Sequence, residues 1–332
     1  MKHLRSSSAI LLFSLLFCFI LISCGSASNK KAENNQDNED NKAVAILTNT
    51  LPIADPFILY HDGIYYAYGT SSDSGFEVYQ SKDLSLWKKH EELALNKADS
   101  YGDKWFWAPE VYYNADNKKF YLYYSAEEHI CVATADSPTG PFAQEEKKPM
   151  REEKSIDSSI FIDENGTPYL YFVRFTNGNV IWVAELEKDL ITIKEETLKQ
   201  CIEVSQDWEK SMATVVEGPS VLKHNGTYYL IYSGNHYQSP DYGVGYATAS
   251  SPFGPWVKYE GNPILQKPET DLVGVGHGAY FTDKDGKYRY IFHAHASPIK
   301  IHPRTAFITD LSISDKGMMS IGGNIIRPKV IQ

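Results

Sequence analysis

Between residues 52 and 304 the chain alternates short apolar runs with turn signals. The runs are rich in Tyr, Ile, Val and Phe, which are typical strand formers, and small or polar residues interrupt them. Pairs such as Asp62-Gly63 and Asn225-Gly226 separate consecutive runs, and such pairs favour the tight turns of β-hairpins. Almost no segment has helical periodicity. The pattern predicts an all-β protein built from antiparallel hairpins.

The same pattern recurs in five segments. Each segment begins with an acidic residue or His, continues with a small residue or Pro, and then has an apolar strand, a turn and a Tyr-rich strand. The leading residues are Asp55, Glu110, Asp157, Glu217 and His277, 47 to 60 positions apart. The predicted strand pairs are 55–60 with 64–72, 110–113 with 119–127, 157–162 with 167–175, 217–222 with 227–235, and 277–281 with 287–295.

This repeat predicts a five-bladed β-propeller over residues 46–332. Units of three or four antiparallel strands cannot bury both faces alone, whereas radial stacking buries them and protects their edges. The spacing is somewhat longer than the usual repeat of about 40 to 50 residues, which leaves room for functional loops. A β-sandwich or jelly roll would account for the strands but not for the recurring leading residue.

The leading residues are the first candidates for chemistry. The innermost strands of a propeller line its axis, so we expect the five leading residues at equivalent heights around one pocket. Carboxylates at close range repel each other and raise each other's pKa, which suits an enzyme that needs a carboxylate beside a protonated carboxylic acid. Each motif alone is also common turn chemistry, as in Asp55-Pro56, so the inference depends on the recurrence.

The N-terminus has a different pattern. Lys2 and Arg5 precede an almost wholly apolar run at 9–22, which is too short for a spanning helix and typical of a secretory signal peptide. The run ends in Leu-Ile-Ser-Cys at 21–24, which resembles the lipobox of bacterial lipoproteins and makes Cys24 the predicted lipidated residue. An ordinary cleaved signal is the alternative.

A polar segment of low complexity follows (GSASNKKAENNQDNEDN, 25–41), and it cannot bury enough apolar surface to fold. We predict a signal peptide at 1–23, a flexible tether at 24–45 and the catalytic propeller at 46–332. The predicted lipid anchor implies a membrane partner and a place in the bacterial cell envelope. The membrane face stays open.

The amino-acid composition limits the classes of molecule that the protein can bind. The formal net charge is −10, and no long basic run follows residue 31, so nucleic acid is excluded as a partner because phosphate binding needs clustered Lys and Arg. With 23 Tyr and 6 Trp, the chain suits a neutral ligand that is stacked upon and hydrogen-bonded, such as a sugar. Cys131 and Cys201 are one pair at most, which is no disulfide framework, and neither has the spacing of a metal site.

The residues around the leading positions also carry a family resemblance. In order they are ADP at 54–56, WAPE at 107–110, IDSS at 156–159, EGP at 217–219 and GHG at 276–278. Together they resemble glycoside hydrolase family 43, over roughly residues 52 to 304. The resemblance implies a five-bladed propeller that hydrolyses glycosidic bonds with inversion of configuration and needs no cofactor for the chemistry.

Carried over by position, the resemblance implies that Asp55 is the general base, Glu217 the general acid, and Asp157 a third carboxylate that tunes and orients the acid. An inverting enzyme separates its two working carboxyl groups by about 6.5 to 9.5 Å, which leaves room for a water molecule. Glu217 has to be protonated when the reaction begins, and repulsion from an ionised Asp157 nearby favours that form.

The resemblance assigns further roles. His277 resembles a His that contacts a bound calcium or sodium ion near the axis, largely through water. A hydrogen-bonded His that supports the carboxylates is the alternative. Arg304 matches an Arg that approaches the sugar. Stacking on the sugar is expected of one aromatic residue among Trp105, Phe106 and Trp107, and the residues predicted to bind substrate are Trp107, Glu110, His236 and Arg304.

The substrate expected from this resemblance is an oligosaccharide or polysaccharide of plant-type pentoses. An α-L-arabinofuranosidase comes first, and a β-xylosidase or an endo-arabinanase is the alternative within the same family. A galactosidase is disfavoured because Asp55 is present. A non-catalytic carbohydrate-binding propeller is the alternative of another class, and it predicts the loss of at least one of the three carboxylates.

Overall fold

The computed structural model describes residues 50–331. The predicted signal peptide at 1–23, the tether at 24–45 and the lipidated Cys24 lie outside the described residues and stay predictions. Within residues 50–331, no helix is long and apolar enough to cross a membrane. The regular helices of this part of the chain are three short 3-10 turns, η1 (Lys97–Asp99), η2 (Glu195–Thr197) and η3 (Asp207–Glu209).

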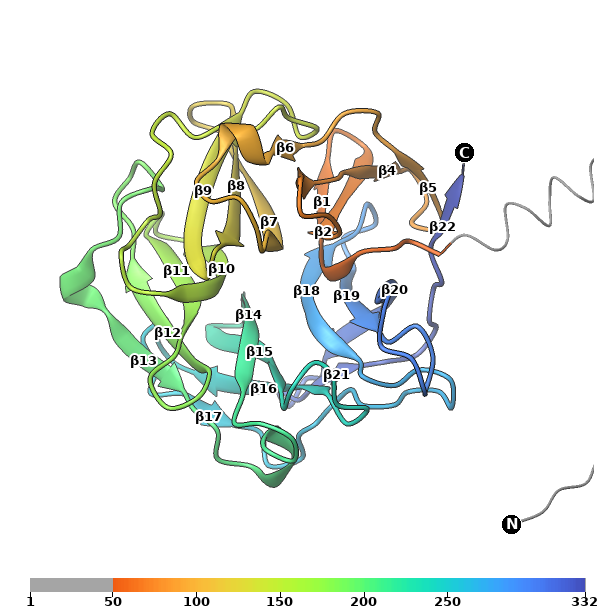
Figure 1. Ribbon diagram of the computed structural model, residues 1–332. Helices are drawn as coiled ribbons and strands as arrows, with labels where there is room; N and C mark the ends of the chain where they lie inside the picture. Colours follow the sequence, from red (N-terminus) through yellow and green to blue (C-terminus); the bar gives the residue numbers. More distant parts are fainter. Residues whose placement is uncertain (1–49, 332) are drawn as a thin grey trace, which may run out of the picture. The chain divides into compact units, whose positions relative to one another are not determined.

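Five sheets surround a common axis, each starting from an inner strand beside that axis (Figure 1). The first blade holds β1 (Ala54–His61), β2 (Ile64–Thr70), β4 (Tyr79–Ser81) and β5 (Leu86–Lys89), and the second holds β7 (Trp107–Asn114), β8 (Lys119–Ala126) and β9 (His129–Ala135). The third holds β10 (Ser155–Ile162), β11 (Pro168–Arg174), β12 (Val180–Glu185) and β13 (Lys199–Ile202). The fourth holds β14 (Val216–His224), β15 (Thr227–Gly234), β16 (Gly243–Ala249) and β17 (Val257–Lys258), and the fifth β18 (Gly276–Thr282), β19 (Tyr288–Ala294), β20 (Thr305–Ile313) and β21 (Met319–Ile321). The five-bladed propeller is confirmed.

The hairpin turns follow from local chemistry. His61 pairs with Ile64 across a loop of two residues, Asp62 and Gly63, with φ of 49° and 79°. Both angles lie in the left-handed region that a tight hairpin turn of this kind requires and that Asp-Gly adopts at low cost. Asn225 and Gly226 form the same kind of turn between β14 and β15. The turn residues predicted from sequence therefore set the register of both hairpins.

Neighbouring blades share five apolar clusters. In β8, Tyr121 and Tyr123 pack toward the third blade, whereas Phe120, Leu122 and Tyr124 pack toward the first. Successive side chains of a strand point to opposite faces, so a strand that is buried on both faces needs a nearly continuous apolar run. The Tyr-rich second strand of each repeat supplies that run. The core is therefore divided among the interfaces between blades.

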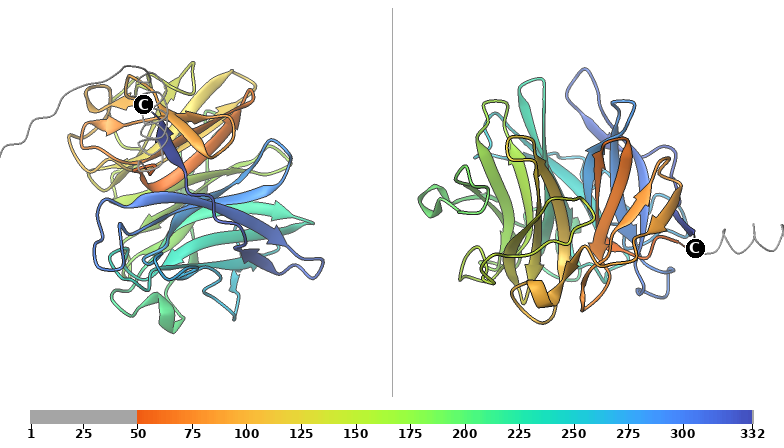
Figure 2. Two further views of the ribbon diagram at one scale, coloured as in Figure 1. Left: turned by 90° about the vertical axis from the view of Figure 1, so that its right-hand side faces the viewer. Right: turned by 90° about the horizontal axis from the view of Figure 1, so that it is seen from above.

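The chain closes its ring at the first blade. The strand β22 (Lys329–Ile331) pairs in parallel with β5, and the Leu51 amide donates to the Pro328 carbonyl at 3.3 Å. Figure 2 shows this last strand, in dark blue, returning to the orange first blade. Two more strands, β3 (Gly75–Phe76) and β6 (Leu95–Asn96), form a separate short ribbon. The segment after Thr305, whose strands the pattern left unassigned, thus completes the fifth blade and closes the ring.

The inner strands share one irregularity, and it corrects the predicted equivalence of the leading residues. Each of the five inner strands has a register break near its start, with one residue at positive φ. These residues are Asp55 (48°), Ala108 (45°), Asp157 (58°), Gly218 (57°) and His277 (39°). Glu217 therefore stands one position before its bulge and Glu110 two positions after. Only Asp55, Asp157 and His277 are equivalent, because the bulge sets the height of each side chain along the axis.

Candidate active site

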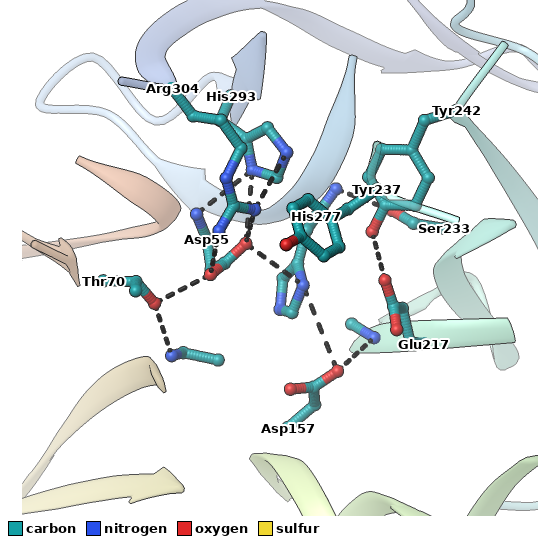
Figure 3. A network of polar contacts seen from close by, with 12 residues as sticks. Asp55, Thr70, Asp157, Glu217, Ser233, Tyr237, Tyr242, His277, His293 and Arg304 are labelled. Carbon is teal, nitrogen blue, oxygen red and sulfur yellow. Dashed lines mark hydrogen bonds and ion pairs between the residues drawn. The ribbon is translucent and has the colours of Figure 1, made fainter. Parts of the chain in front are cut away.

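The carboxylates meet at a cavity at the start of the inner strands. Its volume is about 670 Å³, and Asp55, Asp157 and Glu217 all line it. Of the other predicted site residues, Trp107, His236, His277 and Arg304 line the same cavity. Figure 3 shows the three acidic side chains around His277. Side chains that are up to 249 positions apart in the sequence, such as Asp55 and Arg304, are in direct contact here.

Asp55 is buried and held by charged neighbours. Arg304 donates from Nη1 to Oδ1 at 2.7 Å and from Nη2 to Oδ2 at 3.3 Å, and the Thr70 hydroxyl donates to Oδ2 at 2.7 Å. Burial alone would raise the pKa of Asp55, but Arg304 and His277 outweigh it and hold this pKa well below its usual range. Asp55 is therefore an ionised carboxylate at neutral pH.

The backbone of Asp55 is also fixed. Its amide donates to Nδ1 of His293 at 3.1 Å, and burial lowers the pKa of His293 to about 3, so the ring is neutral and can accept. A residue other than glycine in the left-handed region costs on the order of 1 to 3 kcal/mol, so its conformation needs support from its surroundings. The bond to His293 supplies part of that support and aims the Asp55 side chain at the cavity.

The pKa of Asp157 is shifted in the opposite direction to that of Asp55. The Asp157 amide donates to the Ser125 hydroxyl at 3.0 Å, and Oδ2 of Asp157 accepts from the Gly218 amide at 3.3 Å. Burial, with repulsion from Glu217 and Asp55, raises the pKa of Asp157 to about 7 despite the opposing charge of His277. Burial therefore favours the protonated form of Asp157 near neutral pH.

His277 stands between the two aspartates. Its Nδ1 lies 3.4 Å from Oδ1 of Asp55 and 4.0 Å from Oδ2 of Asp157, and its amide donates to the Ser233 hydroxyl at 2.7 Å. Burial alone would lower the pKa of His277, but the carboxylates of Asp157, Asp55 and Glu217 outweigh it and raise this pKa. The charged form of His277 is thus favoured, and His277 and Arg304 together place positive charge beside the carboxyl groups of the cavity.

Glu217 has a hydrogen-bond donor at each carboxyl oxygen. The Tyr242 hydroxyl donates to Oε1 at 2.8 Å, and Nδ2 of Asn179 donates to Oε2 at 2.9 Å. Burial, together with the charges of Glu217 and Asp55, raises the pKa of Tyr242 well above its usual value, so its hydroxyl stays protonated. Glu217 is only partly buried and keeps access to the cavity.

Glu110 lies elsewhere. It lines a second cavity of about 720 Å³, together with Phe57, Ser159 and Ser220, which stand at the equivalent position in three other blades. A small pocket of about 10 Å³ has Glu110 in its wall as well as Asp55, Asp157 and His277 of the first cavity. Burial raises the pKa of Glu110 to about 8. The structure therefore separates Glu110 from the cavity that holds the other predicted site residues.

Aromatic side chains border the cavity. Trp105 and Trp107 stack with ring centroids 5.8 Å apart, and Trp105 is 40% exposed, whereas Phe106 is buried in the core between the first two blades. Tyr237 lies under the Arg304 guanidinium at 4.6 Å from the ring centroid and stacks on His236. Trp105 and Trp107 are thus the stacking candidates, since Phe106 is used for packing.

Several residues of this site were missed in the sequence. They are Thr70, Asn179, Tyr237, Tyr242 and His293. Asn179 follows Asn177-Gly178, which has the composition of an ordinary turn, and Tyr242 is one of 23 tyrosines. Only contacts between blades distinguish these residues from their neighbours of the same type.

The predicted ion near the axis was compared with the side chains present. Among residues 50–331, no group of three or more His, Cys, Asp or Glu is arranged to hold a metal ion. Hard cations prefer several oxygen ligands, and an imidazolium paired with two aspartates is a poor ligand. His277 therefore fits the role of an ion-pair partner of the carboxylates. An ion held largely through water stays a prediction.

Comparisons with known proteins agree with this geometry. The model of the family described as "Glycosyl hydrolases family 43" matches residues 47–319. A crystal structure described as an endo-1,4-beta-xylanase from Bacteroides thetaiotaomicron VPI-5482 is 58% identical, with a TM-score of 0.84, and the match covers 86% of this chain and 100% of that one.

Two curated relatives are more distant. The beta-D-galactofuranosidase xynD of Aspergillus niger is 30% identical over 262 residues, which are 72% of this chain and 73% of the relative. The arabinoxylan arabinofuranohydrolase of Paenibacillus polymyxa is 29% identical over 294 residues, which cover 73% of this chain and 44% of that longer protein. The chain belongs to the glycosyl hydrolases family 43, and it is an inverting glycoside hydrolase that needs no cofactor for its chemistry.

Proposed function

We propose that Asp55 is the general base and Glu217 the general acid. Asp157 is then the third carboxyl group, which acts electrostatically on the acid and orients it. One observation carries the proposal: a single cavity holds Asp55, whose pKa is held well below its usual range, Asp157, whose pKa is raised to about 7, and Glu217. Pairs of titratable groups whose environments separate their proton affinities are typical of acid–base catalysis. Asp55 is then ready to accept a proton, and Asp157 can hold a proton beside the proposed acid.

The reaction balances as a single displacement. Glu217 gives its proton to the glycosidic oxygen as the bond from that oxygen to the anomeric carbon breaks. A water molecule forms the new bond to that carbon from the opposite face of the sugar, and its proton passes to Asp55. The product has the inverted configuration, and the proton that Glu217 lost is matched by the one that Asp55 gained.

Asp157 acts on Glu217 through charge and position. Its Oδ2 accepts the amide of Gly218, the residue directly after the acid, so it also anchors the backbone there. Nδ1 of His277 lies 4.0 Å from Oδ2 of Asp157, and its positive charge offsets part of the repulsion between Asp157 and Glu217. The proposed role of Asp157 is therefore to orient Glu217 and to hold a proton near it before the reaction.

We propose α-L-arabinofuranosides as the first substrate class. In support, one relative is named an arabinoxylan arabinofuranohydrolase. β-Xylosides are the second candidate, favoured by the 58% identical protein that is described as an endo-1,4-beta-xylanase. Both names point to pentose-containing plant polysaccharides, and the relative described as a galactofuranosidase makes galactofuranosides the necessary third arm of a screen.

The test is hydrolysis of aryl α-L-arabinofuranosides, β-xylosides and β-galactofuranosides, with NMR of the first anomer released. Asp55→Asn and Glu217→Gln are measured beside the wild type, and a thermal melt checks that each variant is folded. We expect turnover to fall by about 10²- to 10⁴-fold in both variants. Turnover by Glu217→Gln equal to that of the wild type, on a substrate with a poor leaving group, would show that the assignment of the acid is wrong.

We also propose that Cys24 carries a lipid that anchors the enzyme in the bacterial cell envelope, on the evidence of the apolar run and the Leu-Ile-Ser-Cys sequence before it. In the producing bacterium, Cys24→Ser should move the enzyme from the membrane fraction to the soluble fraction.

For the predicted ion, dialysis against a chelator is the test. A fall in the melting temperature would support a bound calcium ion, and an unchanged melting temperature and activity would remove the case for calcium.

A further inference from the structure

The carboxyl group of Glu217 is held from both sides, and only one of the two donors lines the cavity. Asn179 is a cavity-lining residue, whereas Tyr242 is fully buried and absent from the cavity wall. Their donors reach different oxygens of Glu217, at 2.9 and 2.8 Å respectively. Two such bonds define the plane of a carboxyl group that is otherwise partly exposed and free to rotate.

Asn179 is fixed to the segment that carries Glu217. Its amide donates to the Thr214 carbonyl and its carbonyl accepts from the Val216 amide, each at 3.1 Å. The preceding residue, Gly178, has φ of 73°, and a Cβ there would lie 2.1 Å from the Thr214 carbonyl oxygen. The loop of the third blade therefore approaches the start of β14 so closely that the amide side chain of Asn179 has little freedom relative to Glu217.

Tyr242 is fixed from the other direction. Its ring stacks on His293 at 5.8 Å between centroids and 15° between planes. A Cβ at Gly276 would lie 2.4 Å from the Tyr242 ring, so only glycine leaves room for it. Because His293 also accepts the Asp55 amide, this buried aromatic pair connects the acid, through Tyr242, with the backbone of the base, through His293 (Figure 3).

We propose that Asn179 and Tyr242 are positioning residues that direct the proton of Glu217 at the glycosidic oxygen, an inference that rests on the proposed role of Glu217. Asn179 offers Oε2 only a donor, whereas the Tyr242 hydroxyl can donate or accept. The two bonds together fix the plane of the carboxyl group, so the direction in which its proton points is set before a substrate binds. The arrangement makes proton donation dependent on two donors from different blades.

The proposal predicts a dependence on the leaving group. A sugar alcohol leaves only if it is protonated, whereas an activated phenolate leaves readily without a proton. Misplacing the acid should therefore slow hydrolysis of an oligosaccharide far more than hydrolysis of an activated aryl glycoside. A merely structural defect would slow both substrates by the same factor, because it reduces the amount of competent enzyme.

The test uses Tyr242→Phe and Asn179→Ala on the full chain, with kcat and KM measured on an activated aryl glycoside and on an oligosaccharide of the same sugar. Tyr123→Phe is the control for a buried hydroxyl, since Tyr123 donates to the Leu190 carbonyl at 2.7 Å, away from the cavity. Asn117→Ala is the control for Asn179, because Nδ2 of Asn117 also donates to a side-chain oxygen, the Tyr121 hydroxyl at 2.7 Å, away from the cavity. Thermal melts accompany each variant.

We expect kcat on the oligosaccharide to fall about 10-fold or more in both variants, and kcat on the aryl glycoside to change by less than about 3-fold, with KM nearly constant. The controls should change neither. Equal losses on both substrates, or no loss on either, would overturn the proposal. If Tyr242→Phe does not fold, Asn179→Ala carries the test alone.

Glu217→Ala is measured in parallel and separates the two hypotheses. If its loss is greater on the oligosaccharide but the losses of the two positioning variants are not, Glu217 is the acid and the positioning proposal fails. If the loss of Glu217→Ala is the same on both substrates, the assignment of the acid fails, and the positioning proposal fails with it.

Discussion

Arg304 and Asp55 form a two-point ion pair across 249 positions of sequence, from Nη1 to Oδ1 at 2.7 Å and from Nη2 to Oδ2 at 3.3 Å. The pair joins the segment just before the third strand of the last blade to the innermost strand of the first blade. Arg304 also lies over the Tyr237 ring, which holds the guanidinium in the cavity wall. The ionised state of Asp55 therefore depends on the closure of the ring.

This pair predicts a shift in the pH profile. Arg304→Ala removes the largest factor that lowers the pKa of Asp55, so this pKa should rise. The base works only when it is ionised, so the acidic limb of kcat/KM should move to higher pH. Arg327→Ala is the control, since Arg327 pairs with Glu269 and Asp271 away from the cavity. An unmoved acidic limb would contradict the role of Asp55 as the base.

The substitution Asp157→Asn should raise the stability of the protein and lower its activity. The pKa of Asp157, about 7 in the folded state, lies above the ordinary aspartate value of 3.8, so the folded state binds a proton more tightly than the unfolded state. Stability is then lost as the pH rises through this interval. Asp157→Asn removes the penalty, so its melting temperature should exceed that of the wild type at pH 8. The difference should shrink toward pH 4.

The activity of Asp157→Asn is measured on the same preparation. We expect a large loss of turnover, because an amide at this position can neither exchange a proton nor carry the charge that acts on Glu217. A melting temperature that is higher by the same amount at both pH values would mean that a packing effect, rather than relief of a buried charge, stabilises the variant.

We expect the exposed side chain of Trp105 to contribute to the binding of longer substrates. Trp105 stacks on Trp107 of the cavity wall and presents 40% of its surface. An apolar sugar face can pack on such a ring, and its loss should cost about 1 to 2 kcal/mol, or roughly 10-fold in KM on a polysaccharide. Trp105→Ala should leave hydrolysis of a small aryl glycoside almost unchanged. An equal rise in KM for both substrates would place Trp105 in the monosaccharide site.

Ring closure predicts a loss of stability on truncation. Removal of residues 328–332 deletes β22, its parallel pairing with β5 and the acceptor of the Leu51 amide. We expect the melting temperature to fall by about 5 °C or more, because the first blade loses its outer strand. A chain that lacks only residue 332 is the control. An unchanged melting temperature after the longer truncation would show that β22 does not contribute to closure.

The sequence by itself determined the repeat, and with it the propeller. Hairpin turns such as Asp62-Gly63 and the Tyr-rich strands after them are local features, and local features can be recognised without knowing their partners. The carboxylates Asp55, Asp157 and Glu217 were also evident, because their motifs recur in order along the chain. All three line the predicted cavity.

Only the tertiary structure decided in which direction, and at which height along the axis, the side chains of the leading residues point. The bulge in each inner strand places Glu217 one residue before, and Glu110 two residues after, the position that Asp55 occupies in its own blade. A shift of one residue turns a side chain to the other face of its strand, and a shift of two moves it along the axis. No composition or spacing encodes where that break falls.

The same limit applies to the residues that support the carboxylates. Tyr242 and Asn179 reach Glu217, and His293 reaches Asp55, across contacts that exist only when separate parts of the chain have packed. In the sequence these are an ordinary tyrosine, a turn asparagine and a strand histidine. Their function comes from the neighbours that the closed ring brings to them, because a hydrogen bond depends on position and direction and not on residue type alone.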